Sequence, residues 1–146
     1  MYRVLFVCIH NSARSQMAEA FLKAMSEGIF YAESAGIEKG RLNPTVVRAM
    51  WEVGIDISDN ETNEVAQYLG EGRTYDAVIT VCDAVSAERC PTFPGNVKKF
   101  AWYFADPSQF MGSEEEMLAQ VRIVRDEIRE SVEDLIKEAK ENNYWK

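Results

Sequence analysis

A cysteine and an arginine stand near the two ends of one short polar segment early in the chain, CIHNSARS, residues 8–15. The apolar run from Arg3 to Val7 precedes this segment, and apolar residues at helical spacing follow it from Ser12 to Met25, so the pattern predicts a strand, a loop and a helix. A loop of this length can turn its backbone N–H groups inward around an anion, while the helix adds the positive end of its dipole. The candidate oxyanion-binding residues are Ile9, His10, Asn11, Ser12, Ala13 and Arg14.

The side chains of this loop predict covalent chemistry on an oxyanion. Cys8 is the candidate nucleophile, because inward N–H groups and the helix dipole favour its thiolate form. Arg14 can direct two guanidinium donors onto a tetrahedral oxyanion, and Ser15 is placed to donate a hydroxyl hydrogen bond to the thiolate. The alternative is an ordinary turn with a structural cysteine, but the strand before and the helix after the loop favour catalysis. A nucleotide-binding loop is excluded, because the Gly-Lys-Ser/Thr ending is absent.

Three further reactive residues lie far from this loop in the sequence. Cys82 directly follows the apolar run Ala77–Val81, Cys90 lies in the polar segment after it, and Asp106 follows the next predicted strand. In a parallel sheet the carboxyl ends of the strands share one edge, where ligands bind. We therefore expect Cys8, Cys82 and Asp106 to meet at that edge, with Asp106 as a candidate general acid. An Asp-Pro pair is also typical of an ordinary turn or helix start.

Strands and helices alternate along the chain. Strands are expected over residues 3–7, 30–34, 75–81 and 99–104, and helices over residues 12–25, 43–54 and 65–69 and from Ser113 onward, where Ser113 and Glu116 fit a capping box. The buried side of the second helix is expected to consist of Val46, Val47, Met50, Trp51 and Val53. This alternation predicts an α/β sandwich around a small parallel sheet.

The composition limits the class of protein. With 146 residues, 47% of them hydrophobic, the chain suits a single domain over residues 1–146. A net charge of −8 argues against nucleic acid binding, because no basic stripe can displace counterions. No run approaches the roughly 18 to 20 apolar residues of a membrane helix, and the N-terminal run is too short for a secretory signal. Three cysteines without an export signal predict reduced thiols in the cytoplasm, and a monomer is expected because no large apolar patch is evident.

The segment VLFVCIHNSARSQMAE, residues 4–19, resembles the low-molecular-weight protein tyrosine phosphatase superfamily and, within it, the thioredoxin-coupled arsenate reductases. The likeness continues in order along nearly the whole chain, through residues 34–37, residues 43–58, Cys82, Cys90-Pro91, residues 97–99, Trp102 and Asp106-Pro107. It implies a three-layer α/β sandwich with a small four-stranded parallel sheet flanked by helices. It also implies a cytoplasmic enzyme that acts on arsenate without a bound cofactor.

The resemblance further implies a relay between the three cysteines. Cys8 forms a covalent arseno-thiol adduct, Cys82 attacks the Cys8 sulfur and releases arsenite, and Cys90 then pairs with Cys82 in a disulfide that thioredoxin, or another thiol donor, reduces. A phosphatase needs neither later cysteine, and phosphatases of this fold carry tyrosines after the Asp-Pro pair, where this chain has Ser108-Gln109-Phe110. The alternatives are a phosphatase for phosphotyrosine or small phosphoesters, and a non-catalytic thiol-sensing or oxyanion-binding module.

Two metal ions can be considered for these residues, potassium and zinc. Asn11, Glu19 and Ser34 match positions that in some relatives support the loop and help to hold potassium, so the resemblance implies a possible potassium ion near them. A zinc site built from the three cysteines and His10 is disfavoured, because their spacing is unlike that of structural zinc motifs. His10 is instead expected to be a partly exposed residue of the loop.

Overall fold

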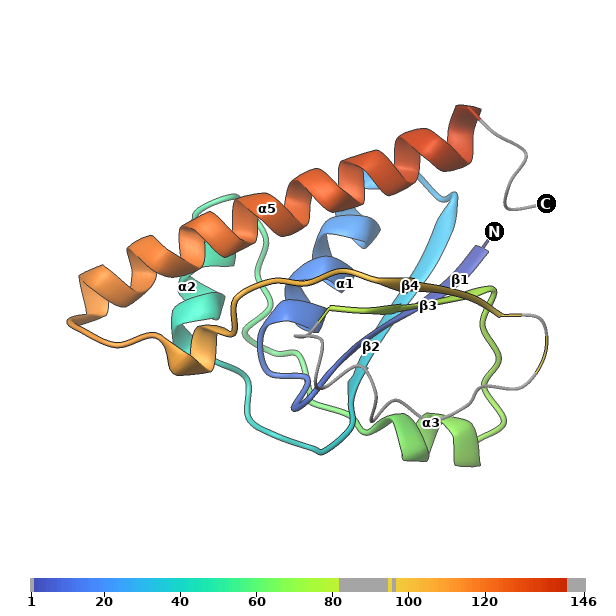
Figure 1. The fold of residues 1–146 in the computed structure, drawn as a ribbon, viewed down its shortest axis with the longest axis horizontal. Helices are drawn as coiled ribbons and strands as arrows, with labels where there is room; N and C mark the ends of the chain where they lie inside the picture. Colours follow the sequence, from blue (N-terminus) through green and yellow to red (C-terminus); the bar gives the residue numbers. More distant parts are fainter. Residues whose placement is uncertain (1, 82–94, 96, 142–146) are drawn as a thin grey trace.

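A four-stranded parallel sheet with the strand order β2-β1-β3-β4 forms the centre of the molecule (Figure 1). The computed structural model describes residues 2–81, 95 and 97–141. The strands are β1 (Tyr2–Cys8), β2 (Phe30–Gly36), β3 (Ala77–Thr80) and β4 (Lys98–Ala101). The helices are α1 (Arg14–Met25), α2 (Pro44–Trp51), α3 (Val65–Gly70), the short 3₁₀ helix η1 (Pro107–Gln109) and α5 (Glu114–Glu141).

Helices cover both faces of this sheet. Along β1 the side chains alternate: Val4, Phe6 and Cys8 join the core formed with α1, α2 and α5, whereas Leu5 and Val7 pack with α3 on the opposite face. Figure 1 shows the same division, with α1, α2 and α5 on one side of the strands and α3 on the other. Because both faces are buried, the central strands consist of continuous apolar runs. The predicted three-layer sandwich is confirmed.

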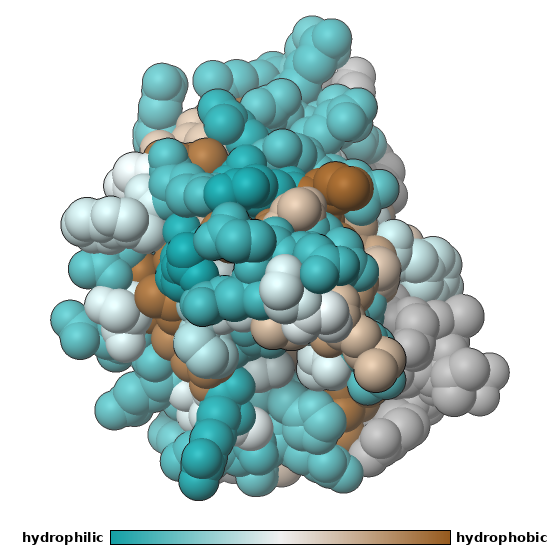
Figure 2. All heavy atoms as spheres, turned by 90° about the vertical axis from the view of Figure 1, so that its left-hand side faces the viewer, coloured by the Kyte–Doolittle hydropathy of each residue, from teal (hydrophilic) through white to brown (hydrophobic). Residues whose placement is uncertain are grey.

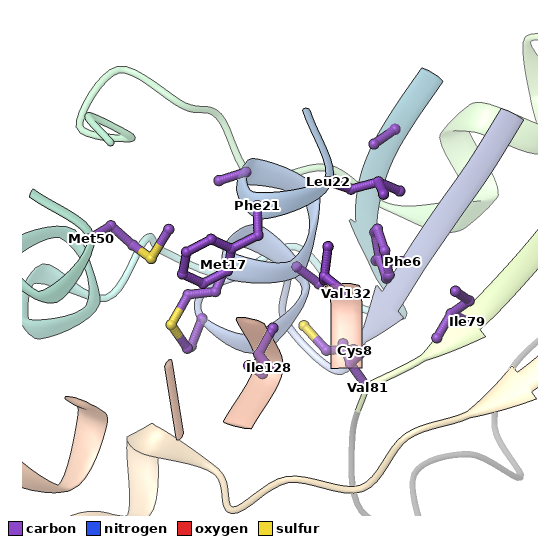
Figure 3. Close-up of a cluster of buried hydrophobic side chains, with 14 of the residues drawn as sticks. Phe6, Cys8, Met17, Phe21, Leu22, Met50, Ile79, Val81, Ile128 and Val132 are labelled. Atoms are coloured by element: carbon purple, nitrogen blue, oxygen red, sulfur yellow. The ribbon is translucent and has the colours of Figure 1, made fainter. Parts of the chain in front are cut away.

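Cys8 belongs to the larger of the two cores. It ends β1, where it pairs with Gly36 of β2, and its side chain is grouped with Met17 of α1 and Ile128 of α5 in one buried cluster (Figure 3). The candidate nucleophile is therefore fixed by a central strand and by the packing of two helices. Functional groups held on such rigid elements keep their geometry better than groups on free loops.

Helix α2 begins as expected but buries a different face. Pro44 is its first residue, and the Asn43 side chain accepts hydrogen bonds from the backbone N–H groups that follow it. Val46, Ala49 and Met50 are buried, at the i, i+3, i+4 spacing of one helical face. Trp51 follows on the solvent side and is 67% exposed, so the prediction that it packs in the core is wrong.

Strand β4 is shorter than expected because its partner is short. The sequence suggested a strand over residues 99–104, but β3 pairs with β4 only through Thr80, and the last ladder bond runs from Trp102 N–H to the Thr80 carbonyl at 2.7 Å. Within the described residues, β3 offers no strand residue beyond Thr80 to pair with the chain. The carbonyl of Phe104 instead accepts a hydrogen bond from Arg14.

Helix α5 begins and packs as its sequence predicts. Ser113 and Glu116 exchange the two hydrogen bonds of a capping box, at 3.1 and 3.3 Å. The apolar stripe from Val121 to Ile136 is buried against α1 and α2, and Glu114, Glu115 and Glu116 are exposed. The face of the molecule where α2 and the start of α5 lie is mostly hydrophilic (Figure 2). Among the described helices, none has the length and apolar character to cross a membrane.

One carboxylate joins the end of α2 to the middle of α5. Glu52 accepts hydrogen bonds from Arg122, through Nη2 at 2.5 Å and Nε at 2.9 Å, and from Arg125 at 2.9 Å. Arg125 also donates to the carbonyl of Ala49 at 2.9 Å. The hydrogen bond from Arg122, supported by the one from Arg125, lowers the pKa of Glu52 to about 2.

We expect Glu52→Gln to lower the free energy of unfolding near pH 7 but not near pH 2. The pKa of Glu52 is below its ordinary value of 4.5 in the folded protein, so the carboxylate stabilises the fold above pH 4.5 and loses this effect as the pH falls towards 2. Urea denaturation at a series of pH values measures the difference between wild type and variant. Glu130→Gln, an exposed site on α5, is the matched control. A difference that does not change with pH would contradict this role.

Candidate active site

The loop between β1 and α1 surrounds the sulfur of Cys8. This side chain is 3% exposed, and its Sγ accepts a hydrogen bond from the backbone N–H of Asn11 at 3.1 Å. Ser15 Oγ lies 2.9 Å from the same sulfur. Because Asn11 Nδ2 donates a hydrogen bond to Ser15 Oγ at 2.8 Å, the hydroxyl hydrogen of Ser15 is free to point at the sulfur. Both contacts stabilise negative charge on Cys8.

The loop carbonyls are all bonded on the side away from the sulfur. Four of them accept hydrogen bonds from the segment that follows β2: Cys8 from Ile37 N at 3.0 Å, Ile9 from Glu38 N at 2.8 Å, His10 from Gly40 N at 3.1 Å and Ser12 from Asn43 N at 2.9 Å. The remaining two, those of Asn11 and Ala13, accept from Gln16 Nε2 and Met17 N. A peptide unit is planar with its C=O and N–H on opposite sides, so the N–H groups of this loop face the interior. This is an anion-binding arrangement.

Asn11 holds the tightest bend of the loop. Its φ is +55°, in the left-handed region that asparagine tolerates better than most residues, and it is completely buried. Its Oδ1 accepts a hydrogen bond from the backbone N–H of Asn63 at 2.9 Å, so the side chain connects the loop to the segment before α3. Strained conformations of this kind persist only where the surroundings fix them.

Arg14 brings the candidate general acid to the loop. Its side chain is 4% exposed, its Nη1 donates to the carbonyl of Phe104 at 3.2 Å, and its Nη2 lies 3.5 Å from Asp106 Oδ2. The other carboxylate oxygen of Asp106 accepts from Ser108 N at 2.9 Å and caps η1. Asp106 therefore both begins a turn and faces the site, so the two interpretations of the Asp-Pro pair are compatible.

The structure brings together only part of the predicted site. The loop residues, Ser15 and Asp106 converge on Cys8 and Arg14, whereas Cys82 and Cys90 lie outside the described residues. Val81, which precedes Cys82, donates from its backbone to the carbonyl of Val7 at 2.9 Å and lies beside Cys8 in Figure 3. The roles of the two later cysteines remain predictions from the sequence.

The residues matched to a potassium site have hydrogen-bond partners within the protein. Asn11 Oδ1 accepts from Gln16 Nε2 and Asn63 N, and one carboxylate oxygen of Glu19 binds Lys23 at 3.0 Å, so the potassium ion stays a prediction from the resemblance. Ser34 is buried. Within the described ranges, no group of three or more His, Cys, Asp or Glu side chains could hold a metal. His10 is half exposed and its Nε2 lies 3.3 Å from Glu38.

Several residues of this site were not predicted from the sequence. Gln16 and Asn63 hold the loop from outside, and the Phe104 carbonyl holds Arg14. Gln16 carried one signal, because it is a polar residue beside Met17 on the buried side of a helix. The Phe104 carbonyl carried none, because a backbone group has no residue-type signature.

A buried cysteine in an oxyanion-binding loop, at the carboxyl edge of a parallel sheet, is the arrangement of an enzyme that attacks oxyanions through a thiol. The chain belongs to the low molecular weight phosphotyrosine protein phosphatase family, which matches residues 3–144. The arsenate reductase of Bacillus subtilis is 44% identical over 127 residues, which are 86% of this chain and 88% of that protein.

Two solved structures are similar along most of the chain. An arsenate reductase in the phosphate binding state is 32% identical with a TM-score of 0.69, over 94% of this chain and 98% of the other. A thioredoxin-dependent arsenate reductase from Corynebacterium glutamicum is 25% identical with a TM-score of 0.62, over 91% of this chain and 62% of the other. Within the family, the chain is thus similar to arsenate reductases in both sequence and fold.

Gly36→Ala should disrupt the loop. A Cβ at this position would lie 2.7 Å from the backbone nitrogen of Asn11 and 2.6 Å from the carbonyl oxygen of Glu38, so backbone would have to move. We expect the free energy of unfolding to fall by about 1–3 kcal/mol and inorganic phosphate to bind more weakly. Urea denaturation and calorimetric titration measure these effects. Gly70→Ala is the control, because its Cβ meets no atom within 4 Å; equal behaviour of the two variants would refute the close contact.

Proposed function

We propose that this protein reduces arsenate to arsenite, with Cys8 as the nucleophile, Cys82 and Cys90 as the source of two electrons, and reduced thioredoxin as the donor that restores them. The observation that carries the proposal is the Cys8 sulfur, enclosed by a loop whose carbonyls are all bonded on its outer side. The similarity to arsenate reductases along most of the chain supports the choice of substrate.

Arsenate binding would use the backbone and one side chain. A tetrahedral anion fits the inward N–H groups of residues 9–13, and Arg14 supplies two directed donors. Arg14 is already held on one side by the Phe104 carbonyl, so little side-chain freedom is lost when the anion arrives. The negative charge of the whole chain, −8, makes this local set of donors necessary.

The first chemical step would be attack of the Cys8 thiolate on arsenic. A sulfur–arsenic bond forms, one arsenic–oxygen bond breaks, and the departing oxygen takes a proton to leave as water. Asp106 is the proposed proton donor, because its carboxyl group lies beside Arg14, which orients the oxyanion. Ser15 and the Asn11 N–H stabilise the sulfur before attack.

The electrons would then come from the two later cysteines. The Cys82 thiolate attacks the Cys8 sulfur, and the electron pair of the sulfur–arsenic bond goes to arsenic, which leaves as arsenite. The Cys90 thiolate next attacks Cys82, frees the Cys8 thiolate and leaves a Cys82–Cys90 disulfide. A reduced dithiol such as thioredoxin opens that disulfide, so each cycle consumes two electrons from outside the protein. We propose that the three thiols are reduced at rest, that the cycle takes place in the cytoplasm, and that the protein acts as a monomer.

A phosphatase activity is the second candidate function. Phosphate and arsenate share shape and charge, and the family to which the chain belongs is described by phosphotyrosine hydrolysis. Cys8, Arg14 and Asp106 suffice for hydrolysis of a phosphoester. The segment after Asp106-Pro107 is Ser108-Gln109-Phe110, without tyrosines to stack on an aryl group, so we propose that this activity is weak.

Cys82→Ser is expected to abolish multiple-turnover arsenate reduction while hydrolysis of an aryl phosphate continues. The serine hydroxyl cannot accept the oxidation of Cys8, whereas hydrolysis needs only the loop and the acid. NADPH consumption coupled through thioredoxin and thioredoxin reductase measures the first activity. Cys8→Ser is the comparison and should lose both activities by about three orders of magnitude or more. Continued thioredoxin-linked turnover in Cys82→Ser would disprove the relay.

Asp106→Asn is expected to slow the chemical step more than binding. Removing a general acid typically costs about 10² to 10⁴ in rate, and the amide keeps the size of the side chain. Single-turnover arsenate reduction by excess reduced enzyme measures the step, and phosphate affinity measures binding. Asp134→Asn on the exposed side of α5 should behave as wild type. An unchanged single-turnover rate in Asp106→Asn would exclude Asp106 as the acid.

A further inference from the structure

Gln16 makes an unusual set of contacts for a side chain in the first turn of a helix. It is 1% exposed, and its Nε2 lies 3.1 Å from the Asn11 carbonyl oxygen, 3.2 Å from Asn11 Oδ1 and 3.0 Å from the Glu61 carbonyl oxygen. Its Oε1 accepts a hydrogen bond from Asn60 Nδ2 at 3.0 Å. Every polar atom of the Gln16 amide is thus used, and all its partners are in the loop or in residues 60–61.

One of these contacts controls the orientation of a single peptide. Among the six loop carbonyls from Cys8 to Ala13, that of Asn11 is the one held by a side chain; the other five accept from backbone N–H groups. The N–H on the same peptide belongs to Ser12. If the Asn11 carbonyl lost its donor, this peptide could rotate and turn its carbonyl oxygen, instead of the Ser12 N–H, towards a bound anion.

The neighbouring residue makes such a rotation easier to reach. Asn11 is held at φ +55° through its own side chain, whose Oδ1 accepts from Asn63 N and from Gln16 Nε2. Gln16 therefore donates to both the backbone carbonyl oxygen and the side-chain oxygen of Asn11, the residue with the positive φ. Asn60 in turn fixes which end of the Gln16 amide faces the loop, because its donor nitrogen requires the oxygen on its side.

We propose that Gln16 is a positioning residue for oxyanion binding, which keeps the Ser12 N–H directed into the loop, and that Asn60 orients it. The proposal rests on the oxyanion-binding role of the loop given above. It assigns to the first turn of α1 a function besides that of Arg14 and Ser15. A donor directed at a charged group contributes far more to affinity than an exposed polar contact, so loss of the Ser12 N–H should be measurable.

The test compares Gln16→Met with wild type, because methionine keeps the length of the side chain and removes its hydrogen bonds. Calorimetric titration of the reduced, folded protein with inorganic phosphate should give a Kd raised by about tenfold or more. KM for arsenate should rise by a similar factor, with a smaller change in kcat. Gln120→Met on α5 is the matched control and should keep both values, since its partners are Met111 and Glu116.

Asn60→Ala provides an independent measurement, which also serves if Gln16→Met does not fold. It leaves Gln16 in place but removes its orienting donor, so the Kd for phosphate should rise by a smaller factor. In the double variant the two effects should not multiply, because they act through one amide. A variant that is less stable but binds phosphate like wild type would overturn the proposal. Failure of the wild-type protein to bind phosphate would instead overturn the function proposed for the loop.

Discussion

The direction of a few peptide groups determines what this molecule can do. Strand β1 ends at Cys8, and the six carbonyl groups from Cys8 to Ala13 all accept hydrogen bonds on the outer side of the loop. Since each peptide is rigid, fixing the oxygen on one side fixes the hydrogen on the other. The segment after β2 supplies most of these donors, so the sheet, the loop and residues 37–43 form one unit. The chemistry proposed for Cys8 depends on that unit, because it directs the N–H groups around the sulfur.

The proposed binding of an anion by an acidic protein is possible because the electric field of the loop N–H groups acts only over a short distance. The chain carries a net charge of −8, and Asp106 lies next to the one buried arginine of the loop. Oriented N–H groups and a helix N-terminus act within a few ångströms, where the distant carboxylates are screened by solvent. Ten of the 24 acidic residues lie on α5, where they are exposed. The acidic surface residues and the positively polarised loop can therefore coexist in one small domain.

Much of the fold could be predicted from the sequence, because helix starts and strand patterns depend on residues that are close in the chain. The apolar runs of the central strands, the Asn43-Pro44 start and the Ser113 capping box depend on residues close in sequence, and all were confirmed. The errors came from tertiary context: β4 ends early because β3 ends, and Trp51 is exposed because the two residues before it, Ala49 and Met50, already fill the core. The candidate site shows the same difference between local signals and tertiary contacts. The loop was visible as a motif, whereas Gln16 and the Phe104 carbonyl become part of it only in three dimensions.

Backbone donors have a consequence for how such a site can diverge. Side chains such as Ile9 and the half-exposed His10 contribute their N–H groups regardless of what they carry beyond Cβ. Substitutions at these two positions would therefore leave the backbone donors of the proposed anion site in place. Differences in activity can then come from the groups around the loop, such as the general acid or the cysteines that reduce the adduct. One loop geometry is therefore compatible with hydrolysis or with reduction, depending on the groups that surround it.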